Sequence, residues 1–319
     1  VQKHSVSDCL KKICAKIRTA TSPNETILFI ILGDLANKGD PLSFNTASNN
    51  FLLIKNELKD YNVKFEFVPG NHDLENGSLH LFSQLTSTFG SAHSYEMSSV
   101  YSNIYEGVNF IFADSTLSRE PDAPGRVDIE AIGANVNRKL TNVLFCHHAL
   151  SQGHGGPHDT IEDVPTVRAK LENMGIDYLF HGHVHDANIT MPTKGLIEIG
   201  CGSLGGDIYW FSSVFHQFLV GYLQDNKIVR VERWIDTEDG HGGFAVDELY
   251  PKPQSFADPD SIGRITYDPV AGYITRYVAP YGDVIRNSLE CLLEDKRTLL
   301  LDVVKIHRKV LLLCDAGIG

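Results

Sequence analysis

Histidine, aspartate and asparagine side chains gather in four short runs along this chain. In chain order the runs are Gly33-Asp34, Gly70-Asn71-His72-Asp73, His147-His148 and Gly182-His183-Val184-His185. Carboxylate, amide and imidazole groups in one set suit Mn, Fe, Zn, Co or Ni better than Ca²⁺. A carboxylate such as Asp34 can give one oxygen to each of two cations and hold them close together. The residue types therefore indicate a two-metal hydrolase.

Each run follows an apolar stretch of strand length. The stretches cover residues 27–32, 64–68, 142–146 and 177–180. Short apolar stretches bounded by Gly, Pro, Asn or Asp are typical of buried strands. Open α/β sheets bind their ligands where strands end, so we expect the four runs to meet at one edge. A single Gly-Asp pair would indicate only a turn, but four such runs, each after a strand, do not arise readily by chance.

The order of these motifs resembles that of the calcineurin-like metallophosphoesterases, which is DxH, GDxx, GNH[DE], H and GHxH. Four of the five motifs are present, and no Asp-x-His precedes Asp34. The resemblance implies an α/β fold of the four-layer α/β/β/α sandwich type. It also implies a binuclear metal-dependent phosphoesterase, in which two divalent metal ions hold the hydroxide that attacks phosphorus.

The family pattern assigns the metal ligands. Asn71, His147 and His183 would join Asp34 on one metal, and His185 would join Asp34 on the other. The second metal would also use the Asp and His of the DxH motif. We therefore expect one complete site and one incomplete site in this chain.

Two residues are candidates for catalysis. In the family, the histidine of GNHD acts on the leaving-group oxygen without binding metal, and this role falls to His72. Asp73 would hold the His72 ring if the two adjacent side chains face the same way; otherwise another carboxylate does so.

Four residues are candidates for substrate contacts: His148, His154, His158 and Arg126. His148 follows a proposed ligand where relatives often carry His or Tyr, and it can equally pack in the core. His154 and His158 belong to the polar stretch 152–159, where loops of the family line the substrate cleft, although solvated loop histidines are commoner. Arg126 would clamp a phosphate by charge-assisted hydrogen bonds, or be an ordinary surface residue.

Composition sets limits on location and partners. Hydrophobic residues make up 42% of the chain and charged residues 21%, so it can bury a full core. The sequence has no apolar run of membrane-spanning length and no signal-peptide pattern, so we expect a cytoplasmic protein. The six cysteines form no CxxC pair, so we expect free thiols. The net charge of −12 argues against coating DNA. It does not exclude a nuclease, because bound cations reverse the local potential.

The remaining elements follow from periodicity and turn residues. An amphipathic helix is expected to begin near Ser7 and Asp8, and in the family this helix follows the DxH strand. We therefore expect the chain to be cut from a longer protein, with that strand upstream of Val1. Further helices are predicted over 51–58, 79–89 and 167–174, and further strands over 196–199 and 208–211. A hairpin is predicted from 217–222 and 227–234, turning at Asp225-Asn226.

Three regions are predicted along the chain. Residues 1–235 form the phosphoesterase domain, and residues 236–285, rich in Asp, Gly and Pro, form a linker or extension. Residues 286–319 are expected to form a helix and a strand. The run from Cys314 to Gly319 matches the first part of a phosphate-binding P-loop, with Cys314 in place of the first glycine. It resembles the start of a STAND-type signalling NTPase; a surface strand with a Gly-rich turn is the alternative.

The first functional hypothesis is a nuclease or nucleotide phosphodiesterase that acts as the effector of such an NTPase, by analogy with other effectors. Its substrate would then be a phosphate ester, in a nucleic acid or a nucleotide, and its partner would be the C-terminal NTPase domain. Whether the chain forms a homo-oligomer is left open. One alternative is a weak or inactive module of the same fold that binds a phosphate ligand or a partner. Another is a protein phosphatase, which ranks low because Leu35-Ala36-Asn37-Lys38-Gly39 lacks the GDxxDRG pattern.

Overall fold

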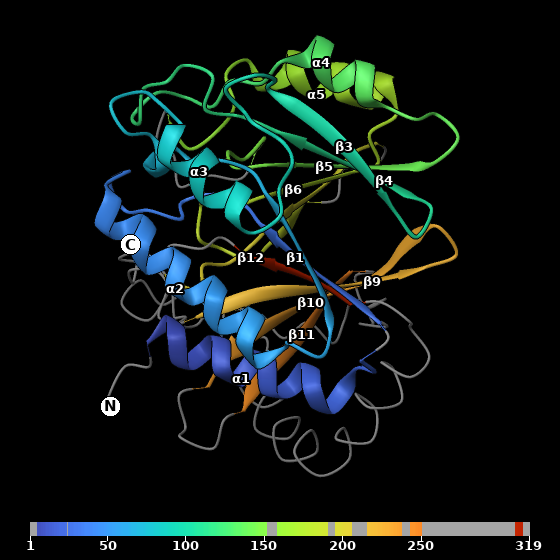
Figure 1. Ribbon diagram of the computed structural model, residues 1–319. Helices are drawn as coiled ribbons and strands as arrows, with labels where there is room; N and C mark the ends of the chain where they lie inside the picture. The colour runs from blue at the N-terminus through green and yellow to red at the C-terminus, as the bar shows by residue number, and fades with distance from the viewer. Residues whose placement is uncertain are drawn as a thin grey trace, which may run out of the picture.

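Two six-stranded sheets lie between two layers of helices (Figure 1). The computed structural model describes residues 5–23, 25–151, 158–190, 195–205, 216–237, 243–250 and 310–314. The first sheet has the order β11 (Phe244–Tyr250), β10 (Lys227–Asp236), β9 (Gln217–Gln224), β12 (Val310–Cys314), β1 (Thr26–Ile31) and β2 (Asn62–Phe67). The second has the order β3 (Val100–Tyr105), β4 (Val108–Ala113), β5 (Thr141–Cys146), β6 (Tyr178–His181), β8 (Ile197–Gly200) and β7 (Ile189–Thr190).

Helices cover the outer face of each sheet. Figure 1 shows α4 (Ile129–Asn135) and α5 (Val164–Met174) above the second sheet, and α1 (Val6–Ala20) and α2 (Pro41–Glu57) beside the first. A further helix, α3 (His80–Thr88), packs at the side of α2. This arrangement is the α/β fold and four-layer sandwich expected from the motifs.

Alternation along the strands of the second sheet builds two cores. In β4, Phe110 and Phe112 belong to the core between the sheets, whereas Ile111 belongs to the core beneath α4 and α5. In β5, Phe145 faces inward and Leu144 outward in the same way. Because successive side chains of a strand point to opposite faces, a sheet buried on both faces is apolar throughout. The metal-site motifs therefore begin only where these apolar strands end.

Local signals set the first two helices. Ser5 caps α1 by accepting from the Asp8 backbone N–H, and the Asp8 side chain returns a hydrogen bond to Ser5. The helix thus begins slightly before the expected Ser7-Asp8 cap. Asp40 caps α2 and Pro41 occupies its first turn, so this helix is much longer than the predicted 51–58.

The hairpin of β9 and β10 is confirmed. It turns at Asp225 and Asn226, whose φ angles are 50° and 62°. Two adjacent residues with positive φ are required by the tightest hairpin turns, and Asp and Asn tolerate this conformation well. The predicted strand at 208–211 lies outside the described residues.

The structure corrects the predicted boundary at residue 235. The first sheet continues through β11, which pairs antiparallel with β10. Of the two alternatives for residues 236–285, residues 244–250 therefore fit an extension of the sheet and not a linker. β12 pairs in parallel with β1 and antiparallel with β9. This strand was expected to begin a separate NTPase; it lies instead inside the phosphoesterase sheet. The predicted helix before it lies outside the described residues.

The helices of the described residues include none that is both long enough and apolar enough to span a bilayer.

Candidate metal centre

The four motifs lie in loops that follow β1, β2, β5 and β6, as the strand pattern predicted. Glycines let two of these loops approach closely. A Cβ on Gly33 would lie 2.5 Å from Nδ1 of His147, and a Cβ on Gly70 would lie 2.2 Å from Oδ1 of Asp34. Gly33 also has a φ of 97°, which favours glycine. These two positions therefore need glycine for the loops to meet.

Four side-chain atoms converge where the loops meet. Nε2 of His147 lies 3.0 Å from Oδ1 of Asn71, 3.1 Å from Nδ1 of His183 and 3.4 Å from Oδ2 of Asp34. Asp34, His147 and His183 form a group whose ligand atoms all lie within 4.8 Å of one another. The structure thus brings together the four residues that the sequence assigned to one metal. His185 is not a member of this group among the described residues.

Hydrogen bonds on the far side of three of the four side chains orient their lone pairs inward. Nδ1 of His147 lies 2.6 Å from the carbonyl of Leu32, which can only accept, so the hydrogen is on Nδ1. Nε2 of His183 lies 3.1 Å from the carbonyl of His158, which places the His183 hydrogen on that atom. The Asn71 amide donates from Nδ2 to the Pro121 carbonyl at 2.8 Å and so turns Oδ1 toward the group.

The result is a cluster of acceptors with no donor among them when both imidazoles are neutral. Lone pairs from Asp34, Asn71, His147 and His183 face one another, which is repulsive without a cation in their midst. Mixed imidazole, amide and carboxylate donors are the set that transition metals accept. The residues present therefore fit one divalent metal ion.

Electrostatics at the cluster agree with this assignment. Burial opposes ionisation of Asp34, yet the imidazoles of His147, His72 and His183 and the His72 N–H outweigh it and lower the pKa of Asp34. Burial and the neighbouring His147 lower the pKa of His183 to about 3. An ionised carboxylate and a neutral imidazole are the forms that bind metal.

His72 lies at the exposed rim of the cluster. Its backbone N–H donates to Oδ1 of Asp34 at 3.1 Å, and its Nδ1 donates to the Asn37 carbonyl at 2.8 Å. This second bond leaves Nε2 as the atom that can meet a ligand. The position suits a group that acts on a leaving oxygen beside the metal.

Asp73 does not hold the His72 ring, so that suggestion is wrong. Its two oxygens accept from the backbone N–H groups of Ala36 and Gly70, each at 2.9 Å. The side chain is fully buried, and burial together with the nearby Asp34 charge raises its pKa well above the usual range. Asp73 therefore ties the first two motif loops together, and its catalytic assignment stays a prediction.

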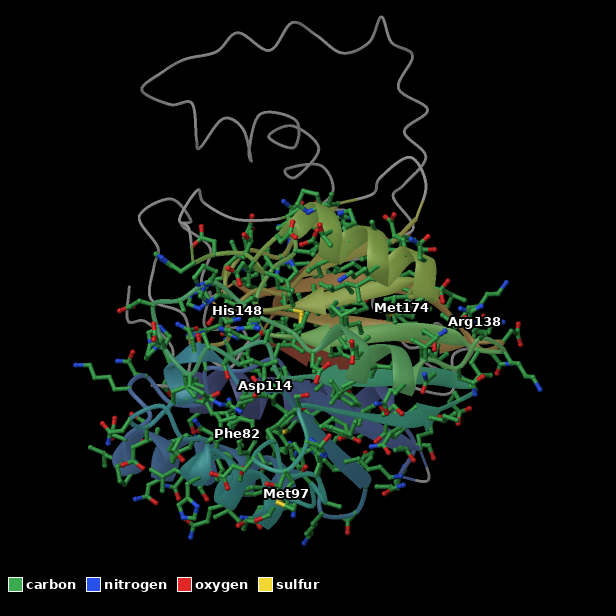
Figure 2. All side chains as sticks on the ribbon, turned by 90° about the horizontal axis from the view of Figure 1, so that it is seen from above. Phe82, Met97, Asp114, Arg138, His148 and Met174 are labelled. Atoms are coloured by element: carbon green, nitrogen blue, oxygen red, sulfur yellow. The ribbon has the colours of Figure 1, made fainter. Side chains whose placement is uncertain are left out.

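His148 is buried beside the cluster, not exposed in a cleft. His148 and Asp114 are buried, whereas Met97 and Arg138 are exposed; all four are labelled in Figure 2. Ser115 Oγ accepts from the backbone N–H groups of His147 and His148, so its own hydrogen goes to Nδ1 of His148 at 2.8 Å. Burial lowers the pKa of His148 well below its usual value. Direct substrate contact by His148 stays a prediction.

The other substrate candidates are spread around the site. His158 is exposed and reaches the cluster through its backbone carbonyl, which accepts from His183. Arg126 is exposed, and its backbone N–H donates to the Ser115 carbonyl at 2.8 Å. His154 lies outside the described residues.

Sequence reasoning missed the residues that hold these loops in place. Ser115 belongs to the run Asp114-Ser115-Thr116, which follows β4 as the metal motifs follow their strands. This polar run after an apolar strand is the signal that would have found it. Glu198 gave no such signal: its buried carboxylate accepts from the N–H groups of Leu150 and Ser151 and pairs with Arg168 at 2.9 Å. It anchors the loop that continues from His147.

Comparison with solved structures found chains that are similar to this one. A dimetal phosphatase from Danio rerio is 15% identical, with a TM-score of 0.52 over 76% of this chain and 88% of that chain. GAP50 of Plasmodium is 13% identical, with a TM-score of 0.46 over 78% of this chain and 85% of that one. A Vps29 mutant from Entamoeba histolytica is 10% identical, with a TM-score of 0.36 over 73% and 85%.

Comparison with curated protein sequences gave no significant match. The sequence model of the calcineurin-like phosphoesterases matches residues 3–187, which is more than half of the chain. That range contains all four motifs and every ligand of the cluster. The chain belongs to the calcineurin-like phosphoesterase family.

Proposed function

We propose that this protein is a metal-dependent hydrolase of phosphate esters, with nucleotide-type phosphodiesters as its first substrate class. The observation that carries the proposal is the convergence of three acceptor atoms, from Asn71, His183 and Asp34, on a fourth, His147 Nε2. Hydrogen bonds on the far side orient the side chains of His147, His183 and Asn71. A set of facing lone pairs is explained by a cation.

Each residue has a distinct part in this proposal. Asp34, Asn71, His147 and His183 hold the metal. When bound, divalent metal lowers the pKa of a water and polarises the phosphoryl group. His72, held through Nδ1 by Asn37, presents Nε2 to the leaving oxygen and gives it a proton or a hydrogen bond. Asp73 keeps the loops of Asp34 and Asn71 together through Ala36 and Gly70.

A substrate panel tests the proposal. The chain is stripped of metal, reloaded with Mn²⁺, Co²⁺ or Zn²⁺, and assayed with bis(p-nitrophenyl) phosphate, p-nitrophenyl phosphate, thymidine 5′-p-nitrophenyl phosphate, cyclic nucleotides and single-stranded DNA. We expect metal-dependent release of product, lost on substitution of His147 by Ala, and greater for the diesters. Metal binding without turnover of any ester would favour the alternative of a phosphate-binding module.

A further inference from the structure

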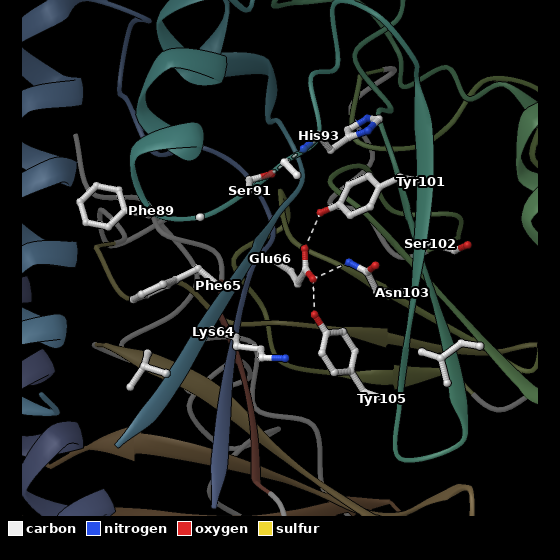
Figure 3. Close-up of a pocket in the computed structure, with 14 residues that line it drawn as sticks. Lys64, Phe65, Glu66, Phe89, Ser91, His93, Tyr101, Ser102, Asn103 and Tyr105 are labelled. Atoms are coloured by element: carbon white, nitrogen blue, oxygen red, sulfur yellow. Dashed lines mark hydrogen bonds between the residues drawn. The ribbon is translucent and has the colours of Figure 1, made fainter. Parts of the chain in front are cut away.

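A cavity of about 670 Å³ lies on the side of the molecule, between the edge strands of the two sheets (Figure 3). β2 is the last strand of the first sheet and β3 the first of the second, so the sandwich is open here. The volume lies within the range of small-molecule sites and far exceeds that of a bare metal ion. The lining includes Phe65, Phe89, His93, Tyr101, Asn103 and Tyr105. None of these is a metal ligand, so the cavity is separate from the metal centre.

The carboxylate of Glu66 lies in the middle of this cavity (Figure 3). The residue is only 6% exposed. One oxygen accepts from the Tyr101 hydroxyl at 2.8 Å, and the other accepts from Asn103 Nδ2 at 2.7 Å and from the Tyr105 hydroxyl. All three donors are neutral, so they stabilise the carboxylate without cancelling its charge.

Glu66 differs in this respect from the other buried carboxylates. Away from the metal centre, each of the others has a cationic partner. The pairs are Asp114 with Arg119 at 2.8 Å, Glu198 with Arg168 at 2.9 Å, Glu232 with Arg230 at 3.3 Å and Asp236 with Lys12 at 2.7 Å. Among the described residues, no Lys, Arg or His nitrogen lies within 4.0 Å of Glu66. Buried charges in proteins are normally paired, and Glu66 lacks the direct ion pair that the other four carboxylates have, although Lys64 also lines the cavity.

The surrounding rings also favour a positive charge. Nζ of Lys64 lies 5.8 Å from the centre of the Tyr105 ring, and Nζ of Lys55 lies 5.1 Å from the centre of the Phe89 ring. These aromatic faces therefore already attract ammonium groups. His93 supplies no compensating charge, since burial lowers its pKa. The net charge of −12 raises the concentration of cations near the whole surface.

We propose that this cavity binds an organic cation, a guanidinium or primary ammonium group carried on a short apolar stem. The cationic group lies against Glu66, and the stem lies along the ring of Tyr105, on the same side of β2. Both phenolic oxygens donate to Glu66 and keep lone pairs that can accept from the ligand. A guanidinium is favoured over an ammonium, because its plane stacks on aromatic rings and presents several N–H donors at once. The source is either a free small amine or an arginine side chain of a peptide.

Calorimetric titration of the whole chain tests the proposal. The ligands are agmatine, an acetylated and amidated arginine tripeptide, and N-butylurea, which is a neutral match for the planar group and its stem. We expect the cationic ligands to bind at least about tenfold more tightly than N-butylurea, because hydrogen bonds to charged groups are worth roughly that factor. Tighter binding of agmatine than of the tripeptide identifies a free metabolite, and the reverse order identifies a peptide. Equal binding of agmatine and N-butylurea would overturn the proposal.

Two variants separate the cavity from a general effect of charge. Glu66→Gln is expected to weaken agmatine binding about tenfold. Glu232→Gln removes a carboxylate that is also buried and also accepts from a tyrosine hydroxyl, but outside the cavity, and should leave binding within about twofold. Equal weakening by both variants contradicts the cavity as the site.

Two further measurements cover the case in which Glu66→Gln does not fold. Backbone amide shifts of the wild-type chain should move on addition of agmatine at residues 101–105 and not at Asp34 or His147. Lys64→Met should tighten binding, since the lysine beside Tyr105 competes for the same rings. Binding that appears only in Lys64→Met would mean that the chain's own lysine fills the site, and the proposal of a separate ligand would then be wrong. All these measurements are made without phosphate ester, so they do not depend on the proposed hydrolase activity.

Discussion

Nε2 of His147 lies 3.0 Å from Oδ1 of Asn71, although both atoms are acceptors when the imidazole is neutral. The Leu32 carbonyl fixes the hydrogen of His147 on the opposite nitrogen, and the Pro121 carbonyl fixes the orientation of the Asn71 amide. Neither side chain can turn away without losing its buried bond. The two lone pairs therefore keep the orientation that a metal ion would need.

The chain should bind about one divalent transition metal tightly, because the described residues supply one set of four converging ligands. The other metal of the family would share Asp34 and be held by His185, which is too few ligands for a firm site. We therefore expect slow hydrolysis of bis(p-nitrophenyl) phosphate. Elemental analysis after dialysis, measured beside turnover, checks this. Two tightly held metals with fast turnover would contradict it.

Substitution of His72 by Ala should lower turnover by about two to four decades while metal content stays unchanged, because the ring acts on the leaving group and not on the metal. The loss should be larger for an alkyl ester than for a p-nitrophenyl ester, whose leaving group needs little help from a proton. His80→Ala, at another exposed histidine, is the control. Loss of metal from His72→Ala would show that the role is wrongly assigned.

Substitution of Gly70 by Ala should abolish tight metal binding. The added Cβ would lie 2.2 Å from Oδ1 of Asp34, so the carboxylate must move. Gly70 has a φ of −102°, which alanine adopts without strain, and the effect is therefore steric. Gly133→Ala, whose Cβ would meet only the flexible Met174 side chain at 3.4 Å, should bind metal normally. Metal titration of the two variants gives the comparison, and equal affinities would refute the argument.

Substitution of Glu198 by Gln should destabilise the fold by about 3 kcal/mol near neutral pH, because it leaves a largely buried Arg168 without its partner. Burial opposes ionisation, but His181, Ser151 and the Leu150 N–H outweigh it, so the pKa of Glu198 lies below its ordinary 4.5. A carboxyl group whose pKa is lowered by folding stabilises the fold at pH values above its pKa in the unfolded chain. This stabilisation is lost as the pH falls.

The difference in unfolding free energy between wild type and Glu198→Gln should therefore be full above about pH 4.5 and shrink in more acidic solution. Urea unfolding at a series of pH values measures it. Glu130→Gln, at an exposed position in α4, should differ little from wild type at any pH. A difference for Glu198→Gln that grows toward acid would mean that the carboxylate is not held in its charged form.

The sequence by itself determined the four strands that precede the motifs, the motif loops and the candidate ligands of one metal. Short apolar stretches and turn residues are local signals, so β1, β2, β5, β6 and the Asp225-Asn226 hairpin could be predicted. The resemblance of the motif order to the family pattern assigned Asp34, Asn71, His147 and His183 to one metal. The side chains of these residues carry oxygen or nitrogen atoms that can bind metal, and this can be seen from the residue type alone.

Only the tertiary structure decided which groups orient the candidate ligands and His72. The carbonyls of Leu32, Asn37 and Pro121 are backbone atoms that every residue has, so no sequence pattern marks them. The surroundings of Glu66 could not be predicted either, because the burial of its charge depends on how β2 and β3 meet. The place of β12 was mistaken because a short aliphatic strand fits any buried sheet equally well. Long-range packing supplies that information, and a linear pattern does not contain it.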